Sequence, residues 1–290
     1  MPLLPKRLVK VFASKYIAGE LITDAISTAK KIGSLGGTTT IDVLGEFVES
    51  RGQALKETAM QKMVVDAIVN EGLATYLSVK PTSVGMGIDR DFGYENILEI
   101  VDYAHNMGVF VRLDMENSPY TSLTLEYYKR LRDIGYENIG FVIQAYLKRS
   151  MDDIIELAEY KPNTRLCKGI YVERAEIAYK NPDEIRNNYT ALLDKMIELG
   201  YFVGIATHDQ TLIDYAEKKI AEENLTKDQY EFQMLLGVRE SARNALLQNH
   251  NVRIYVPFGL DWYGYSIRRF NENPEMAKTI ALSFLKPWKN

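Results

Sequence analysis

Eight short apolar segments, on average about 30 residues apart, constrain the fold of this chain more than any other feature. Each segment is rich in β-branched and aromatic residues and is bounded by Gly, Pro, Asn or Asp, a pattern typical of buried strands. The segments are residues 38–46, 73–82, 109–117, 139–146, 164–171, 201–209, 230–237 and 252–259. Stretches with helical periodicity lie between them, for example 122–135 and 187–200. Eight strand–helix units in succession predict an α/β fold, namely a closed (β/α)8 TIM-type barrel.

The same spacing predicts one barrel domain with a helical addition at each end. Residues 1–37 have helical periodicity that stops at two consecutive glycines, which indicates an N-terminal helical segment. The barrel then covers residues 38–273 without a Pro/Gly/Ser-rich linker, and its eighth helix is expected over 261–273 with Asp261 as the N-cap. Residues 274–290 are expected to form a short amphipathic C-terminal helix.

Composition and cysteine usage exclude several classes of protein. A net charge of −4 over 290 residues gives no electrostatic reason to expect nucleic-acid binding. The single cysteine, Cys167, excludes an internal disulfide, and we interpret it as a small core side chain. The histidines His105, His208 and His250 lack the spacing of a metal site, and neither a Rossmann fingerprint nor a P-loop is present. Because no apolar run approaches ~20 residues and no targeting segment is recognisable, we expect a cytoplasmic protein.

Charged side chains occupy strand positions that point into the predicted barrel. Arg112, Asp114 and Glu116 share one parity of the third strand, opposite to its aliphatic residues. Because helices cover the outside of a parallel barrel, the charged face must point inward. The same parity sends inward Asp42, Glu46, Ser78, Lys80, Gln144, Glu231, Gln233, Arg253 and Tyr255. Buried charges cost several kcal/mol each unless they are paired, so this set is expected to serve ion pairing, a ligand, or both.

Position along each strand separates these residues into two groups. The early positions predict a structural ion-pair network at the bottom of the barrel, made by Asp42, Arg112, Glu231 and Arg253. The strand ends predict a functional site, because the chemistry of such barrels lies there. The candidates at the strand ends are Lys80, Asp114, Arg165, Lys168, His208 and Tyr255. Arg165 and Lys168 have opposite parity, so a bend at Gly169 would be needed to direct both at one ligand.

Two adjacent arginines in the predicted eighth helix have two interpretations. Arg268 and Arg269 taken alone fit a solvated helix face. Above the mouth of a barrel, the two neighbouring guanidinium groups would instead bind a small carboxylate through bidentate hydrogen bonds.

Several motifs, in order along the chain, resemble one known family. They read RLDMEN, VIQAYLKRS, RLCKGIYVE, IATHD, YEFQMLLG and RIYVPFG, followed by YSIRRFNENP. Together they resemble proline dehydrogenase, a flavin-dependent barrel enzyme, from about residue 40 to residue 273. The resemblance implies FAD at the C-terminal mouth of the barrel and oxidation of L-proline to 1-pyrroline-5-carboxylate, the first step of proline degradation to glutamate. It also implies an oxidoreductase that acts on a CH–NH bond and passes its electrons to a membrane quinone.

The resemblance also assigns roles to individual residues. It places Arg165 near flavin N5 and gives Asp114 the task of orienting the active-site network. Residues implied to contact FAD are Met115, Gln144, Lys168, Gly169, Ile170, Thr207 and His208. Residues implied to bind proline are Lys80, Tyr255, Arg268 and Arg269. Tyr255 would pack against the proline ring near C4 and so favour proline over 4-hydroxyproline. The family more often has Val and Ala where this chain has Cys167 and Ile170.

Three questions stay open in the sequence. Residues 276–289 combine apolar and basic side chains, so the tail either packs on the barrel, which we favour, or contacts the inner face of the cell membrane peripherally. A Schiff-base lyase would use Lys80 or Lys168 as an amine nucleophile and would need no flavin. A barrel that serves only as a binding or scaffolding module would have an aliphatic lumen, without an inward Lys80, Asp114 or Tyr255.

Overall fold

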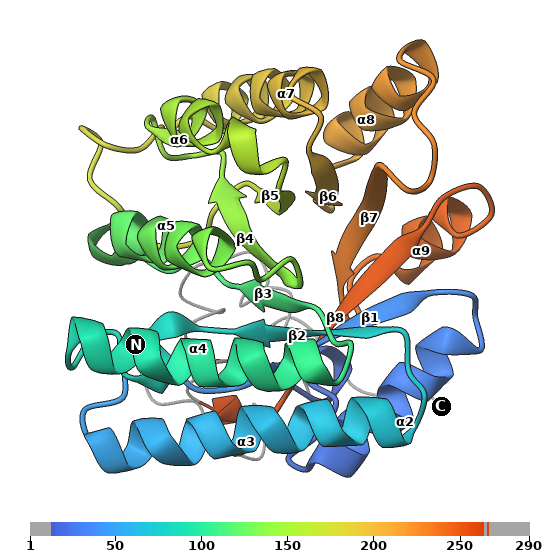
Figure 1. Ribbon diagram of the computed structural model, residues 1–290. Coiled ribbons are helices and arrows are strands. Elements are labelled where there is room, and N and C mark those ends of the chain that lie inside the picture. The colour runs from blue at the N-terminus through green and yellow to red at the C-terminus, as the bar shows by residue number, and fades with distance from the viewer. Residues whose placement is uncertain (1–12, 264–265, 267–290) are drawn as a thin grey trace, which may run out of the picture.

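The computed structural model describes residues 13–263 and residue 266. Within them, eight parallel strands form a closed barrel in sequence order, and the helices ring its outside (Figure 1). The strands are β1 (Thr38–Val43), β2 (Thr75–Val79), β3 (Val111–Leu113), β4 (Ile139–Gln144), β5 (Asn163–Cys167), β6 (Phe202–Ala206), β7 (Tyr230–Leu235) and β8 (Val252–Phe258). The prediction of a (β/α)8 TIM-type barrel is confirmed. Most strands end several residues before the predicted segments do, and the remainder of each segment is loop at the C-terminal face.

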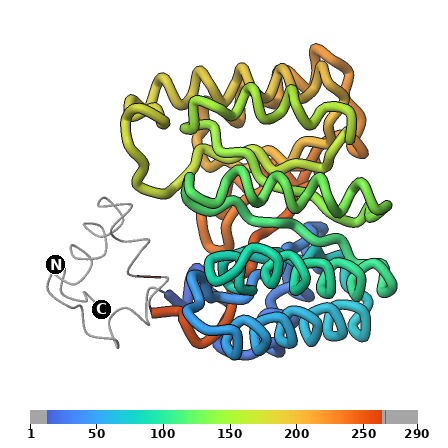
Figure 2. Tube along the Cα trace, turned by 60° about the vertical axis from the view of Figure 1, so that its left-hand side comes forward, coloured from blue at the N-terminus to red at the C-terminus, as the bar shows by residue number. Residues whose placement is uncertain are grey.

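The helices alternate with the strands. They are α2 (Ile22–Gly33), α3 (Arg51–Asn70), α4 (Arg90–Asn106), α5 (Ser118–Asp133), α6 (Ser150–Glu156), α7 (Pro182–Glu198), α8 (Gln210–Glu222) and α9 (Glu240–Leu246). Short 3-10 turns, η1 (Pro81–Val84) and η2 (Ala158–Tyr160), follow β2 and α6. The predicted helical stretches 122–135 and 187–200 correspond to α5 and α7. Figure 2 shows α3 and α4 lying side by side along the barrel wall.

Side-chain caps fix where several of these helices begin. Ser50 accepts a hydrogen bond from the backbone N–H of Gln53, and Asp89 accepts one from Phe92, each at the start of a helix. Such caps satisfy backbone donors that the first turn of a helix leaves without a partner. They therefore fix the residue at which each loop ends and the helix begins.

Alternation along the strands separates an apolar outer layer from a polar lumen. Val111 and Leu113 are fully buried between the sheet and the helices, whereas Arg112 between them points into the barrel. The main hydrophobic core therefore lies between the strands and the surrounding helices, as expected for a parallel sheet covered on its outer face. The lumen is left for polar side chains.

The lower lumen confirms one part of the predicted ion-pair network and corrects another. Arg253 Nε lies 2.7 Å from Glu231 Oε1, as the network requires. Arg112 instead donates to the backbone carbonyls of Phe141 (3.0 Å) and Asn163 (2.5 Å) and makes no ion pair with any described residue. Burial, reinforced by Arg165, lowers the pKa of Arg112 to about 9. The prediction was wrong for Arg112 because carbonyl oxygens, which parity does not reveal, supply its acceptors.

Asp42 also lies in a different place from the one expected. Its carboxylate pairs with Lys80 at the upper level of the lumen. Strand β1 ends at Val43, so Asp42 is its next-to-last residue and lies in register with Ser78, two residues before Lys80.

The two ends of the chain were predicted to be helical. Helix α2 confirms part of the segment 1–37 and packs against β1 and β8. The predicted tail 274–290 and most of the predicted eighth helix lie outside the described residues, so both stay predictions, as does the division of the chain at 37 and 273.

Candidate active site

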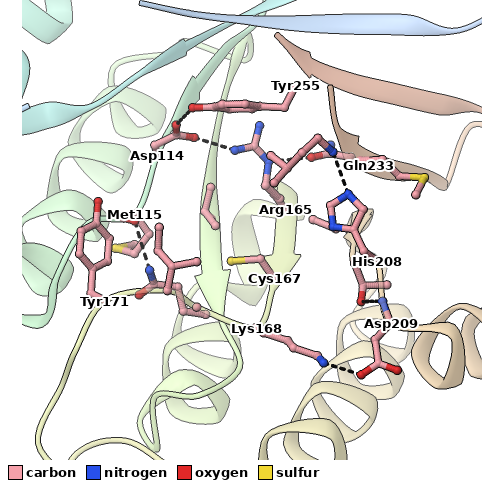
Figure 3. A pocket seen from close by; sticks show the side chains of 18 of the residues that line it. Asp114, Met115, Arg165, Cys167, Lys168, Tyr171, His208, Asp209, Gln233 and Tyr255 are labelled. Carbon is pink, nitrogen blue, oxygen red and sulfur yellow. Dashed lines mark hydrogen bonds and ion pairs between the residues drawn. The ribbon is translucent and has the colours of Figure 1, made fainter. Parts of the chain in front are cut away.

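A cavity of about 470 Å³ opens at the C-terminal ends of the strands (Figure 3). Its wall contains every described residue that the sequence suggested for the site, namely Lys80, Asp114, Met115, Gln144, Arg165, Lys168, Gly169, Ile170, Thr207, His208 and Tyr255. Arg268 and Arg269 lie outside the described residues. The polar strand ends therefore converge on one place, although they come from six different strands or the loops directly after them.

Asp114 is the centre of the polar network. It directly follows β3, and its Oδ1 accepts hydrogen bonds from Arg165 Nη1 and Ser78 Oγ, both at 2.7 Å. Its Oδ2 accepts a third bond of 2.7 Å from the Tyr255 hydroxyl. Burial raises the pKa of Asp114, but the charges of Arg165 and Lys80 outweigh burial and hold this pKa below its usual value. Asp114 is therefore an ionised acceptor that orients three neighbours at once.

Lys80 approaches the same network from β2. It forms a buried ion pair with Asp42, and its Nζ lies 3.4 Å from the Tyr255 hydroxyl. Burial lowers the pKa of Lys80, yet Asp42 and Asp114 more than offset this and raise it to about 12. A lysine amine must be neutral to act as a nucleophile, so this environment disfavours the Schiff-base alternative at Lys80.

Arg165 occupies the middle of β5 and points into the lumen. Its Nε donates to Gln233 Oε1 at 2.6 Å, and its guanidinium carbon lies 5.1 Å from the centre of the Tyr255 ring. Gln233 fits because Gly204 faces it: a Cβ at position 204 would lie 2.4 Å from Gln233 Nε2. Parity had sent Gln233 inward but had not marked it as a site residue, because its partner Arg165 is 68 residues away.

The chain bends directly after β5, which brings Lys168 to the same cavity as Arg165. Gly169 adopts a φ of +98°, and a Cβ at this position would lie 2.2 Å from the Tyr146 ring. Lys168 Nζ is held 2.5 Å from Asp209 Oδ2. The predicted bend at Gly169 is therefore confirmed, and glycine is required there both by backbone conformation and by space.

Asp209 is a site residue that the sequence argument missed. Besides Lys168, it accepts a hydrogen bond of 2.7 Å from Arg186 Nε and caps α8 through the backbone N–H of Thr211. Burial raises the pKa of Asp209, but its bonds to Lys168 and Arg186 lower it to about 2. An aspartate at the start of a helical stretch is a recognisable N-cap signal, but its two cationic partners come from other loops and helices.

His208 is neutral in this site. Its Nε2 accepts a hydrogen bond of 3.0 Å from the backbone N–H of Leu235, which places the ring proton on Nδ1. Burial, together with the charge of Arg239, lowers the pKa of His208 to about 4. His208 can therefore donate one hydrogen bond to a ligand but does not supply a positive charge.

Two further wall residues bear on what the cavity can hold. Cys167 is half-buried: it packs against the main hydrophobic core, as expected, and it also lines the cavity, because it is the last residue of β5. Gln144 is almost fully buried and donates from Nε2 to the Met115 carbonyl at 3.2 Å, whereas its Oε1 has no hydrogen-bond partner within the described structure. Neighbouring wall residues that the sequence did not single out are Val142, Tyr171, Ala206, Met234 and Leu235.

The cavity combines an apolar wall with side chains of fixed charge, namely the cations of Lys80, Arg165 and Lys168 and the carboxylate of Asp114. No group of His, Cys, Asp and Glu side chains that could hold a metal ion occurs in the described part of the chain. Lys80 and Arg165 offer positive charge from the lumen side, and Lys168 offers it from the rim. Such a cavity suits an organic ligand with an extended apolar ring and negatively charged or carbonyl groups.

Comparison with known proteins agrees with this arrangement. A family model described as proline dehydrogenase matches residues 25–281. Proline dehydrogenase 2 of Bacillus subtilis (strain 168) is 36% identical over 276 residues, which cover 95% of this chain and 90% of that protein. Proline dehydrogenase of Deinococcus radiodurans is 34% identical over 279 residues, with 94% and 90% covered.

A solved structure supports the same relationship. The crystal structure of proline utilization A (PutA) from Bdellovibrio bacteriovorus, inactivated by N-propargylglycine, superposes with a TM-score of 0.86 at 26% identity. The superposition covers 92% of this chain and 33% of that one, so the chain spans about a third of that PutA. A match over most of the sequence, relatives above 30% identity and a shared barrel all lead to one conclusion: the chain belongs to the proline dehydrogenase family.

Proposed function

We propose that this protein binds FAD in the cavity at the C-terminal ends of the strands and uses it to oxidise L-proline to 1-pyrroline-5-carboxylate. Proline dehydrogenase function, the first step of proline catabolism, follows from family membership. The cofactor and the product are the proposed parts, supported by the motifs and by the chemistry of the cavity wall.

The observation that best supports the FAD proposal is that the buried Oε1 of Gln144 has no hydrogen-bond partner within the described structure. A buried amide oxygen without a partner costs roughly 1–3 kcal/mol, so its persistence in a cavity wall indicates a ligand that donates to it. The cavity volume of about 470 Å³ lies within the range of ligand sites. Gly169 also lines the cavity, with the Tyr146 ring packed where a side chain at 169 would lie. These residues fit a flat heterocycle with ring N–H and carbonyl groups.

Several side chains would hold the cofactor. Gln144 and Met115 would touch its ring system, and Lys168, Gly169 and Ile170 would lie along it. Thr207 and the Nδ1–H of His208 would lie on its adenosine or phosphate side, where neutral His208 contributes a hydrogen bond only. When bound, FAD would accept the hydride that leaves C5 of proline.

The remaining residues would act on charge and on orientation. Arg165 would stabilise negative charge that develops next to it, with its guanidinium held in place by Asp114 and Gln233. Protonated Lys80, together with Arg268 and Arg269, would hold the proline carboxylate, so that C5 is oriented rather than free to rotate. Tyr255, fixed by Asp114, would pack against the proline ring.

The electron acceptor and the location belong to the same proposal. Electrons would pass to a membrane quinone, and the protein would work in the cytoplasm with peripheral contact to the inner face of the cell membrane. None of the helices in the described residues is long and apolar enough to cross a membrane.

An absorbance spectrum of the purified protein tests the proposal. The protein should carry a flavin band that L-proline bleaches in the absence of oxygen. Gln144→Leu should raise the dissociation constant for FAD about three- to tenfold, because one hydrogen bond contributes about 0.5–1.5 kcal/mol. Gln61→Leu is the matched control, since the buried Oε1 of Gln61 also lacks a partner but does not line the cavity. A protein that takes up no FAD and does not react with proline would contradict the proposal.

A further inference from the structure

The loop between β5 and α7 is attached to the N-terminus of another helix, α5. The Glu173 carboxylate accepts two hydrogen bonds from Ser118, one from the backbone N–H to Oε1 at 2.6 Å and one from the hydroxyl to Oε2 at 2.7 Å. Ser118 is the first residue of α5, so a residue 55 positions away supplies the cap of this helix. A carboxylate at this point is also favoured by the helix dipole.

The residue that would normally cap α5 does not do so. Asn117 occupies the N-cap position, but its side chain makes no capping hydrogen bond. Its Oδ1 is buried and has no partner among the described residues. An N-cap side chain accepts from the second or third helical N–H, but the second residue of α5 is Pro119, and the Tyr120 N–H already donates to the Asn117 backbone carbonyl at 3.0 Å. Glu173 instead accepts from the first helical N–H, that of Ser118, and so joins two loops at the start of one helix. This connection calls for an explanation beyond the capping of α5.

The position of Glu173 in its loop supplies that explanation. Lys168, Gly169, Ile170 and Tyr171 line the cavity, and Glu173 follows two residues after them. Val172 is 92% exposed, so hydrophobic packing does not hold this part of the loop. On the other side, Ser118 follows the cavity residues of β3 by only a few positions. Glu173 thus ties the loop that carries residues 168–171 to the start of α5, which follows Asp114 and Met115 in the chain.

The beginning and the end of the loop have their own attachments. The backbone N–H of Tyr146 donates to the Lys168 carbonyl at 2.8 Å, and that of Tyr179 donates to the Tyr146 carbonyl at 2.8 Å. Both attachments lead to the loop after β4. The segment between them has further attachments: Lys168 pairs with Asp209, and the Tyr171 hydroxyl donates to Glu46 Oε2 at 3.4 Å. Glu173 adds the attachment to the start of α5.

We propose that Glu173 is a positioning residue for the cofactor: by capping α5 it holds residues 168–171 as a preformed wall against which FAD binds. This inference rests on the proposed use of FAD. Glu173 itself does not line the cavity, so its effect on the cofactor is indirect. Preorganising a loop raises affinity because the cost of ordering it is met before the ligand binds.

Two substitutions at this position separate hydrogen bonding from charge. Glu173→Gln keeps an oxygen for the Ser118 N–H and offers an amide N–H to the Ser118 hydroxyl, so both contacts survive. Glu173→Ala removes both. The measurement is release of flavin from the diluted holoenzyme, followed by flavin fluorescence, which yields a dissociation constant without turnover. We expect Glu173→Ala to weaken FAD binding at least about tenfold and Glu173→Gln to stay within about threefold of the wild type.

Controls identify the cause of any change. Glu176→Ala removes a carboxylate from the same loop that pairs only with exposed Arg174 in the described structure, and it should leave the dissociation constant unchanged. Ser118→Ala keeps the backbone N–H and removes the hydroxyl, so it should give an intermediate effect. Amide hydrogen exchange of the flavin-free protein should speed up in residues 168–173 and in the first turn of α5 for Glu173→Ala, and not elsewhere in the barrel.

The outcomes separate the two proposals. A wild-type protein without bound FAD would contradict the proposed function. If the wild type binds FAD, and Glu173→Ala binds it equally well with unchanged exchange in residues 168–173, the positioning role is wrong. If Glu173→Ala fails to fold, Ser118→Ala decides the question, because wild-type affinity and wild-type loop exchange in that variant would overturn the inference.

Discussion

The Tyr255 hydroxyl donates a 2.7 Å hydrogen bond to Asp114 across the lumen, although the two residues are 141 positions apart. Strands β8 and β3, which carry them, are separated in the barrel by β1 and β2. Asp114 also holds Arg165, whose guanidinium carbon lies 5.1 Å from the centre of the Tyr255 ring. The three side chains therefore form one unit, and a change in any of them should alter the other two.

Removing the central carboxylate should destabilise the protein as well as inactivate it. Asp114→Ala leaves the Arg165 charge buried without its counterion, which should lower the free energy of unfolding by about 3–5 kcal/mol. Urea denaturation measures this change. Glu198→Ala is the control, since it breaks a surface ion pair of 2.8 Å with Lys195 and should cost less than about 1 kcal/mol. Equal losses for the two variants would show that the buried pair has no special role.

The Tyr255 ring should determine which proline derivatives fit. Tyr255→Ser opens space in the cavity wall, so the ratio of kcat/KM for 4-hydroxyproline to that for proline should rise. The rise should correspond to a change of roughly 1–3 kcal/mol in the difference between the two transition-state free energies. Tyr255→Phe keeps the ring and loses the bond to Asp114, so it should leave this ratio nearly unchanged while activity on both substrates falls. Steady-state kinetics with both substrates measure the ratio. An unchanged ratio in the serine variant would show that Tyr255 does not contact the substrate ring.

The adjacent arginines of the predicted eighth helix should bind the substrate carboxylate. Arg268→Met or Arg269→Met should raise KM for proline with near-normal FAD content, and each lost bidentate contact should cost about 1.5–3 kcal/mol. Arg174→Met is a suitable comparison, since Arg174 is an exposed arginine that pairs with Glu176. A solvated helix face would leave KM unaltered, and loss of FAD at constant KM would point to a cofactor contact instead.

Stability should depend on pH through Glu116. Burial raises the pKa of Glu116 to about 7, even though Thr82 donates two hydrogen bonds to its carboxylate. Because the pKa of Glu116 is higher in the folded protein than in the unfolded chain, its contribution to the free energy of unfolding depends on pH. This contribution is fully present below pH 4.5, the pKa in the unfolded chain, and is lost as the pH rises through about 7. The loss should be on the order of 3 kcal/mol.

Glu116→Gln should remove this part of the pH dependence. The free energy of unfolding, measured in urea between pH 4.5 and 8, should fall less steeply for the variant than for the wild type. Burial also raises the pKa of Asp42, to about 6, but Asp42 is present in both proteins, so the difference between the two curves isolates Glu116. Parallel curves would show that Glu116 is not the titrating group.

The barrel and its lumen could be predicted because they follow from periodicity. Alternation in β3 requires that Arg112 face opposite to Val111 and Leu113, and covering helices decide which face is apolar. The same rule placed Gln233 and Tyr255 correctly in the lumen. The rule does not show where a strand ends, which is why Asp42 was assigned to the wrong level: β1 ends at Val43, so Asp42 lies near the end of the strand, beside Lys80.

The loops beyond the strands could be predicted only in part. A bend at Gly169 was anticipated because two basic residues of opposite parity needed it, and its φ of +98° confirms it. The partners of the bent segment were not anticipated. Asp209 and Ser118 bind residues of the β5–α7 loop from other βα units, and loop conformation has no period that would reveal such contacts.

The sequence by itself determined that this chain forms eight strand–helix units with a polar lumen, because alternation and burial are local properties of each strand. Its ordered motifs also indicated the proline dehydrogenase family. Only the tertiary structure decided which charges pair: Asp42 with Lys80, Asp114 with Arg165, and Lys168 with Asp209. It also decided that Glu173, rather than Asn117, caps α5. The physical reason is that pairing depends on the stagger of the closed barrel and on the paths of its loops, which are set by contacts between residues far apart in the chain.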